Sequence, residues 1–289
     1  MARILCLGFF DSVHCGHRAL IEVGAKLAKD RGVQIEVVTF DDGFFTARNR
    51  GEKLIYTARE RKKLLLDLGV DRVQIVQATG TLFNMEGDDF LNSILSKDVV
   101  GVVVGSDYKY GKNAQGNVNS LLCYCNKRNI DVKIVDLVEV DLHKIASSDI
   151  RELLKNGDIS SANMLLGQCY SMYGKVVHGK GNGKKFDIPT ANIAYSWCKL
   201  LPKRGVYKTN TIIEGVSYAS LTNVGTQPTF EGSQVTVETL ILHYKGNDIY
   251  NKNITVEFDR RLRGISKFNS PDELVAQIKK DIAEVEADD

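Results

Sequence analysis

Two histidines three residues apart, His14 and His17, place imidazole groups where an apolar run gives way to a helical pattern. Residues 3–10 predict a strand, and the apolar positions over 20–27 recur at helical spacing. In an open α/β sheet this turn lies at the ligand crevice, and a helix N-terminus favours phosphate. Two imidazoles there could donate hydrogen bonds to charge developing on an α-phosphate. A fortuitous pair and a pair of metal ligands are the alternatives.

A second candidate is the glycine- and lysine-rich stretch that begins at His178. Its glycines free the backbone to turn N–H groups toward an anion, and its lysines add positive charge. The candidate phosphate-binding residues are Gly179, Lys180, Gly181 and Gly183, with Lys184 and Lys185 beside them. The stretch matches neither the P-loop pattern nor GxGxxG, so a solvated hairpin is the alternative.

Thr190 and Asn192 follow this stretch two residues apart, on one face of an expected strand. A hydroxyl and an amide oxygen are hard ligands suited to Mg²⁺ with ATP phosphates. The alternative is that both side chains form hydrogen bonds at the start of a strand.

Glu238 is the best candidate for a general base. On the expected strand 234–242 it shares one face with Thr236, Leu240 and Leu242. A carboxylate aligned with leucines is partly desolvated, which would raise its pKa toward that of a useful base. An ion-paired glutamate at an exposed sheet edge is the alternative.

The predicted secondary structure that positions these residues differs between the two halves of the chain. In the first half, short apolar runs alternate with helical patterns, which predicts a doubly wound parallel sheet. From about Cys169 onward, short strands separated by turns predict an antiparallel barrel or sandwich, followed by a helix over 270–286. Ser270 and Glu273 could form a capping box for that helix. We expect two domains, residues 1–167 and 168–289.

Composition sets further limits. The 289 residues carry a formal net charge of +2, which gives no overall attraction to nucleic acid or membrane. Charges interrupt every apolar run, and the N-terminus does not match a secretory signal, so we expect neither a membrane span nor export. The six scattered cysteines suggest free thiols in a reducing cytoplasm.

The motifs resemble those of prokaryotic-type bifunctional riboflavin kinase/FMN adenylyltransferases (FAD synthetases). "GFFDSVHCGH", "VVGSDYKYGKNAQGN" and "KIASSDIREL" look like the nucleotidyltransferase half. "YGKVVHGKGNGKKFDIPTANI", "NVGTQPTF" and "VETLIL" resemble the riboflavin kinase signature. The resemblance covers nearly the whole chain in one order.

This resemblance implies a nucleotidyltransferase-like α/β domain followed by a small β-barrel kinase domain with a terminal helix. The implied substrates are riboflavin, FMN and ATP, with Mg²⁺ as cofactor and no nucleic-acid or membrane partner. In the kinase, Glu238 takes the proton of the ribityl 5′-hydroxyl. In the other half, His14 and His17 act on ATP, and the expected phosphate-binding residues are Asp107, Ser147, Ser148 and Arg151.

The adenylyltransferase half departs from the family pattern at several places, including Ser12, Ala146, Ser148 and Asp149. Asp41, Asp42 and Gly43 stand where the family carries Pro-His-Pro. Two acids near a triphosphate site should weaken the binding of an anion. Three hypotheses follow: a bifunctional enzyme, a riboflavin kinase with a vestigial α/β domain, and a flavin- or nucleotide-binding regulator without catalysis.

Overall fold

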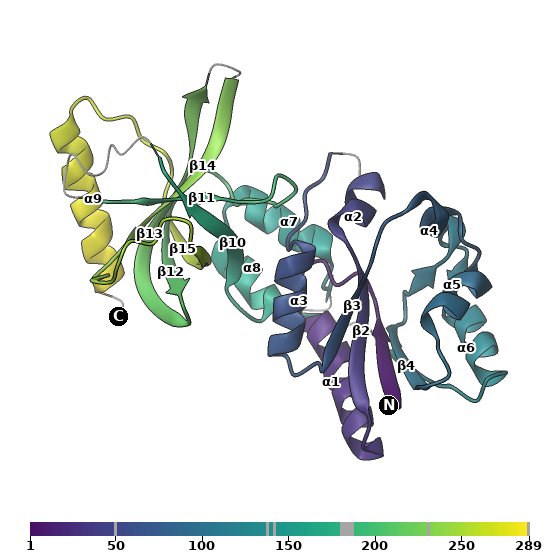
Figure 1. Ribbon diagram of the computed structural model, residues 1–289. Helices are drawn as coiled ribbons and strands as arrows, with labels where there is room; N and C mark the ends of the chain where they lie inside the picture. Colours follow the sequence, from purple (N-terminus) through teal and green to yellow (C-terminus); the bar gives the residue numbers. More distant parts are fainter. Residues whose placement is uncertain (49–50, 137–138, 141–142, 180–187, 230–231, 288–289) are drawn as a thin grey trace. The chain divides into compact units, whose positions relative to one another are not determined.

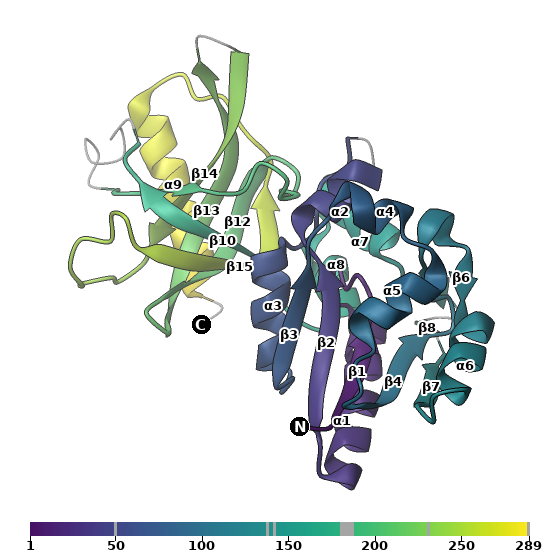
Figure 2. The ribbon, with the colours of Figure 1, turned by 45° about the vertical axis from the view of Figure 1, so that its right-hand side comes forward.

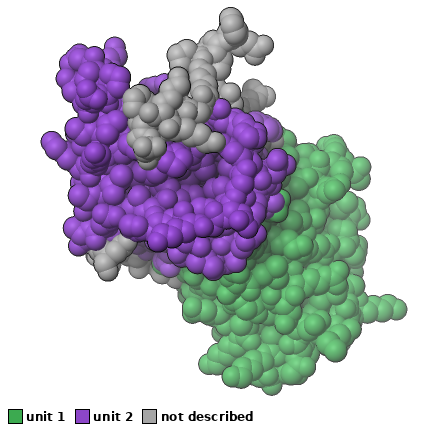
Figure 3. All heavy atoms as spheres, turned by 60° about the vertical axis from the view of Figure 1, so that its left-hand side comes forward, with its two compact units in different colours: residues 1–147 green, residues 148–289 purple. Residues whose placement is uncertain are grey.

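The computed structural model describes residues 1–48, 51–136, 139–140, 143–179, 188–229 and 232–287 (Figure 1). Contacts divide the chain into two compact units, Met1–Ser147 and Ser148–Asp289 (Figure 3). The division leaves two helices that follow Ser147 with the second unit.

The first unit is built on a five-stranded parallel sheet with the order β3-β2-β1-β4-β7. Its strands are β1 (Arg3–Leu7), β2 (Gln34–Phe40), β3 (Arg72–Val76), β4 (Val99–Gly105) and β7 (Asp131–Val135). The three central strands are buried along most of their length, as expected for a parallel sheet covered on both faces.

Helices cover both faces of this sheet (Figures 1 and 2). On one face, α1 (Cys15–Arg31) and α3 (Ala58–Asp67) pack on the strand residues that point toward them, such as Cys6 and Val37. On the other face, α5 (Gly87–Ile94) and α6 (Val118–Asn126) pack on the alternate residues. The predicted doubly wound arrangement is confirmed.

Several short elements lie around this frame and were not predicted. They are α2 (Asp42–Arg48), α4 (Gly80–Asn84), the 3₁₀ helix η1 (Lys112–Ala114), the ribbon of β5 (Lys109–Tyr110) with β6 (Gly116–Asn117), and the ribbon of β8 (Glu139–Val140) with β9 (His143–Lys144). Most of them occupy the loops that follow strands β2, β3, β4 and β7, where an α/β fold builds its ligand site.

The second unit begins at the second residue of α7 (Ser147–Asn156). It continues with α8 (Ile159–Leu166) and a closed antiparallel barrel. The barrel order is β10-β11-β14-β13-β12-β15. Its strands are β10 (Tyr170–Val177), β11 (Ala191–Ala194), β12 (Gly205–Ile213), β13 (Val216–Thr229), β14 (Gly232–Ile241) and β15 (Asn253–Arg263). Of the two predicted alternatives, the barrel is therefore correct.

Helix α9 (Pro271–Glu286) covers one outer face of the barrel (Figure 1). Its buried Val285 packs with Val206, Leu221 and Leu240. Ser270 caps α9 by accepting a hydrogen bond from the backbone N–H of Glu273, as predicted.

The second hydrogen bond of the expected capping box is not formed with Ser270. The Glu273 carboxylate instead accepts from the N–H of Asn269 at 2.9 Å, one residue before the cap.

In the part of the chain that the structure describes, no helix is both long enough and apolar enough to cross a membrane.

Candidate active sites

The first unit holds a pocket of about 620 Å³ at the carboxyl ends of β1 and β4. Its lining includes Leu7 and Gly105, the last residues of these two strands. The chain runs from β1 toward β2 on one side and returns with β4 on the other, so the pocket lies at the topological switch point of the sheet. This is the crevice that the sequence predicted for the histidine pair.

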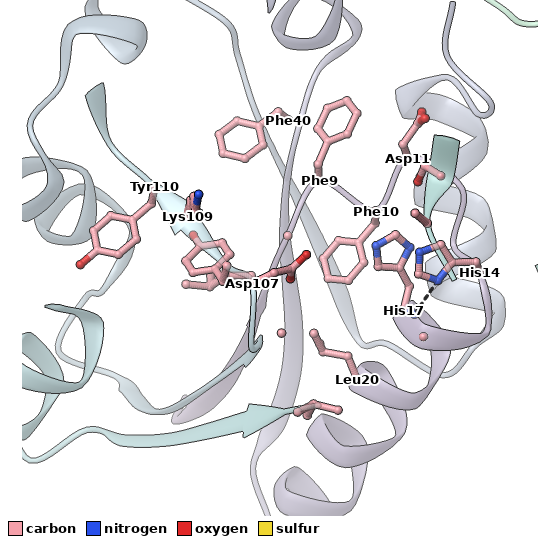
Figure 4. A pocket seen from close by; sticks show the side chains of 18 of the residues that line it. Phe9, Phe10, Asp11, His14, His17, Leu20, Phe40, Asp107, Lys109 and Tyr110 are labelled. Atoms are coloured by element: carbon pink, nitrogen blue, oxygen red, sulfur yellow. Dashed lines mark hydrogen bonds between the residues drawn. The ribbon is translucent and has the colours of Figure 1, made fainter. Parts of the chain in front are cut away.

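Both histidines line this pocket, and the turn between β1 and α1 holds them together (Figure 4). His14 is the N-cap residue of α1, and its Nδ1 accepts the backbone N–H of His17 at 3.2 Å. The imidazole rings stack at 3.8 Å with 9° between their planes. Because His14 Nδ1 is an acceptor, this ring carries its proton on Nε2. Phe10 and Val13 in the same turn have positive φ angles of 55° and 46°, a strain that is common at functional turns.

His17 is a neutral imidazole in this environment. Burial lowers its pKa well below 6.5, and the neighbouring His14 lowers the pKa further. The Nδ1 atom of His17 is buried and has no hydrogen-bond partner among the described residues. The metal-ligand alternative would need further ligands, and the described residues contain no cluster of three or more His, Cys, Asp or Glu placed for a metal.

The rest of the pocket combines aromatic rings with charge. Figure 4 shows Phe9, Phe10, Phe40 and Asp107 between the histidine pair and the side that carries Lys109 and Tyr110. The described lining contains three carboxylates, Asp11, Asp107 and Asp136, and a single ammonium group, on Lys109.

Lys109 was missed by sequence reasoning. It occupies the variable position of the "SDYKYG" motif, and a cation inside a nucleotide motif was the signal available.

Of the other predicted residues of this half, Asp107 and Ser147 line the pocket. The hydroxyl of Ser147, the last residue of the first unit, lies 2.9 Å from that of the buried Ser12 in the turn after β1. Ser148 and Arg151 lie further along α7, in the second unit; Ser148 is exposed and Arg151 is buried.

The acidic replacement of Pro-His-Pro forms the start of α2. Asp41 Oδ1 accepts the N–H of Phe44 at 3.1 Å, and Asp42 Oδ1 accepts the N–H of Ala58 at 2.6 Å. Asp42 also lies 3.9 Å from Arg61, a fully buried cation. Both acids thus have structural partners, and neither is among the described residues that line the pocket. The geometry gives no support to the expected repulsion of a triphosphate by these carboxylates.

In the second unit, the predicted metal ligands and the predicted base lie together, with Thr190 directly before β11, Asn192 on β11 and Glu238 on the neighbouring β14. Asn192 on β11 is paired with Glu238 on β14. The hydroxyl of Thr190 lies 3.5 Å from Glu238 Oε2, a long contact for a hydrogen bond. A Cβ atom added at Gly179 would lie 2.1 Å from the Asn192 side-chain nitrogen, so the start of the glycine stretch packs directly on this amide.

The predicted residues Lys180, Gly181 and Gly183, with their neighbours Lys184 and Lys185, lie outside the described residues. Of the predicted phosphate-binding residues of this stretch, only Gly179 is therefore placed at this site.

A pocket of about 380 Å³ opens beside these residues, between the barrel and α9. Thr236, Glu238 and Leu240 all line it, so the face predicted from their spacing is the one observed. Asn223 on β13 is paired with Glu238 on its other side and also lines the pocket. Sequence reasoning did not select Asn223, although it is the first residue of the "NVGTQPTF" motif.

Two family models match this chain. The model described as FAD synthetase matches residues 2–149, and the model described as riboflavin kinase matches residues 166–288. Two bacterial proteins named bifunctional riboflavin kinase/FMN adenylyltransferase are similar over nearly the whole length. The one from Listeria monocytogenes is 32% identical over 96% of this chain and 90% of its own length. The one from Bacillus subtilis is 31% identical, with the same coverage.

A crystal structure of a Streptococcus pneumoniae protein named as a macrolide-efflux protein is also similar. It has a TM-score of 0.87 and 29% identity, over 99% of this chain and 94% of its own. The likeness extends through both units and shows that the complete two-unit fold occurs in another protein.

Riboflavin kinases and FAD synthetases both transfer a phosphorus-containing group, so the two family matches define an enzyme of the transferase class. The chain belongs to the bifunctional riboflavin kinase/FMN adenylyltransferase family. The family and the enzyme class predicted from the motifs are confirmed.

Proposed function

We propose that the barrel unit makes FMN from riboflavin and ATP, with Glu238 as general base. The observation that carries this proposal is the position of Glu238 at a largely apolar pocket, with the Thr190 hydroxyl beside it and Asn192 and Asn223 as its partners on the two neighbouring strands. The family match of residues 166–288 supports the same reaction.

In this reaction the ribityl 5′-hydroxyl oxygen attacks the γ-phosphorus of ATP. Glu238 accepts the hydroxyl proton, a new O–P bond forms, and the bond from the γ-phosphorus to the bridging oxygen breaks to release ADP. Gly179, Lys180, Gly181 and Gly183 are the proposed phosphate-binding residues, and of these Gly179 is among the described residues. The half-buried position of Glu238 keeps bulk water from competing for its proton-accepting oxygen.

Thr190 and Asn192 are the proposed ligands of Mg²⁺. Their hydroxyl and amide oxygens fit a hard cation, and the nearby Glu238 carboxylate adds negative charge. A bound Mg²⁺ would supply charge neutralisation at the phosphates during transfer.

We further propose that the first unit transfers AMP from a second ATP to FMN. An oxygen of the FMN phosphate attacks the α-phosphorus, and the bond to the bridging oxygen breaks to release pyrophosphate. The His14 and His17 rings are proposed to donate N–H groups to the charge that develops on the α-phosphate. Asp107, Ser147, Ser148 and Arg151 are the proposed nucleotide-binding residues.

The two catalytic modules are proposed to be residues 1–167 and 168–289. Small-molecule substrates suffice for both reactions, and no nucleic acid or membrane is required. Six free cysteines fit a reducing cytoplasm, which is the proposed location.

Incubation of the protein with riboflavin, ATP and Mg²⁺, followed by chromatography of the flavins, tests the proposal. FMN and FAD together are expected. FMN alone would support the second candidate function, a riboflavin kinase with a vestigial first unit. The replacement of Pro-His-Pro is the observation that favours this candidate. Unchanged riboflavin would leave the non-catalytic regulator and overturn both enzyme hypotheses.

Two variants act as controls for each other. Glu238→Gln should abolish FMN formation while added FMN is still converted to FAD. His17→Gln should still form FMN but should not convert it to FAD. Full FMN formation by Glu238→Gln would remove this residue from the mechanism.

A further inference from the structure

One row of paired residues crosses five strands of the barrel beneath α9. Asn192 pairs with Glu238, and Glu238 pairs with Asn223. Asn223 pairs with Val206, and Val206 pairs with Arg263. Directly paired residues of antiparallel strands point to the same face, so the row runs from the proposed metal ligand and base to an arginine.

A β-bulge brings Arg263 into this row. Tyr207 pairs with Arg261, but Val206 pairs with Arg263, so Leu262 is an extra residue on β15. In a regular strand Arg261 and Arg263 would point to the same face. The bulge separates them and turns Arg263 onto the face where the row and the pocket lie.

Helix α9 fixes the guanidinium once it is there. Arg263 Nη2 donates to Asp281 Oδ2 at 2.7 Å, and Nε lies 3.0 Å and 3.1 Å from the two carboxylate oxygens. Gln277 donates a further hydrogen bond to Asp281 at 2.8 Å. The Asp281 side chain is only 3% exposed, whereas that of Arg263 is 21% exposed. The pair therefore holds the cation in one orientation at the wall of the pocket.

Part of the guanidinium remains available to a ligand. Nη1 donates to the carbonyl of Gly264 at 3.3 Å, which together with Asp281 accounts for three of the five N–H groups. The remaining N–H on each terminal nitrogen has no partner among the described residues. No other arginine and no lysine is among the described residues that line this pocket.

The space between the two ends of the row has the shape and polarity of an elongated planar ligand. Glu238 and Arg263 are three strand spacings apart, roughly 14 Å along the curved sheet at about 4.8 Å per spacing. Apart from Asn223, the row and the walls beside it are mostly apolar, with Val206, Leu221 and Leu240 from the barrel and Leu274, Val275 and Ile278 from α9. Riboflavin with its 5′-hydroxyl at Glu238 would extend its ring along this passage.

We propose that Arg263 is a specificity-determining residue of the kinase site and donates hydrogen bonds to the carbonyl oxygens on the pyrimidine edge of the flavin ring. Asp281 and Gln277 are positioning residues that act through Arg263. This inference rests on the proposed kinase function, since that function places riboflavin in the pocket. At the other end of the flavin, Glu238 positions the ribityl 5′-hydroxyl by accepting its proton.

The test compares Arg263→Gln and Arg263→Lys with the wild type, using riboflavin and lumiflavin as ligands. Lumiflavin has the ring and its carbonyls but no ribityl chain. Losing a hydrogen bond to a charged donor should weaken the binding of both ligands about 10- to 100-fold in Arg263→Gln. Arg263→Lys keeps a cation beside Asp281 but loses the planar fork, so it should bind both flavins with intermediate affinity.

Kinetics separate ring binding from chemistry. In Arg263→Gln, KM for riboflavin should rise, while KM for ATP and kcat at saturating riboflavin should stay within about threefold of the wild type. Arg260→Gln is the matched control. Arg260 joins the same strand and helix through Glu284 at 2.7 Å, but it is not among the described residues lining the pocket. It should leave flavin affinity unchanged.

Unchanged lumiflavin affinity in Arg263→Gln would overturn the proposal, as would an equal loss in Arg260→Gln. If Arg263→Gln lowers the unfolding temperature, the lumiflavin affinity of Arg263→Lys is the test. Intermediate affinity supports the proposal, and wild-type affinity overturns it. Absence of FMN formation by the wild type would overturn the kinase function alone. The lumiflavin affinities of the same variants would still support or overturn the role of Arg263.

Discussion

Thr222 and Thr239 are paired across β13 and β14 inside the barrel, with their hydroxyl oxygens 3.0 Å apart. The next pair along the same strands is Asn223 with Glu238, which faces outward into the kinase pocket. Thr209 extends the contact, since its hydroxyl lies 2.7 Å from that of Thr222. Buried hydroxyls inside the barrel thus stabilise the strand register that positions the candidate base outside it.

Thr222→Val should therefore destabilise the barrel unit. The change keeps the side-chain shape but leaves the buried hydroxyls of Thr209 and Thr239 with fewer partners, at a cost of about 1–3 kcal/mol in the free energy of unfolding. Denaturant unfolding measures this cost. Ser217→Ala, at an exposed position of the same strand, should change it little. Equal stability of Thr222→Val and the wild type would show that the hydroxyl contacts do not hold the register.

Gly179→Ala should disable the kinase and spare the other reaction. The added methyl group would meet the Asn192 side chain at 2.1 Å, so either the amide or the start of the glycine stretch must move. FMN formation should fall at least tenfold, as expected when a proposed metal ligand is displaced, while FMN is still converted to FAD. Gly80→Ala is the control, because a Cβ there meets nothing within 4 Å. Wild-type kinase activity in Gly179→Ala would mean that the Asn192 position is not critical.

Asp42→Ala should lower the stability of the first unit without improving AMP transfer. The change removes an acceptor of the Ala58 N–H and one of the carboxylates near the buried Arg61, a loss of about 1–3 kcal/mol. The sequence alone predicted a different effect on activity: the acids should weaken ATP binding, so removing one of them should improve it. Unfolding and KM for ATP measure the two effects. Asp67→Ala removes an exposed acid and is the control. A lower KM for ATP in Asp42→Ala alone would restore the electrostatic interpretation.

The sequence predicted best what periodicity and motif order control. Alternating strands and helices gave the doubly wound sheet, because that pattern reflects which faces are buried. The strand face of Glu238 was predictable for the same reason, since side chains of a strand alternate. The fate of Asp42 was not predictable, because its partner Arg61 is 19 positions away and is brought close only by the packing of α3.

The position of Arg263 could not be predicted from the sequence either, for a different reason. Its place beside Val206 depends on one extra residue in β15, and a bulge changes the face of a side chain without any clear mark in the sequence. Its partner Asp281 is on a helix that looked merely amphipathic. Asn223 and Lys109 did stand inside recognised motifs, so a closer reading of those motifs would have selected them.

The stability of the first unit should fall as the pH drops below about 6.5, and His17 should account for part of the loss. Burial lowers the pKa of His17 in the folded state, so the unfolded chain binds its proton first as the pH falls. Its contribution is therefore complete above about 6.5, the ordinary pKa of histidine, and is lost progressively below it. Thermal unfolding between pH 7.5 and pH 5.5 measures the slope. His17→Gln should flatten it, because glutamine has no proton to gain, and an unchanged slope in that variant would show that His17 is not held neutral in the fold.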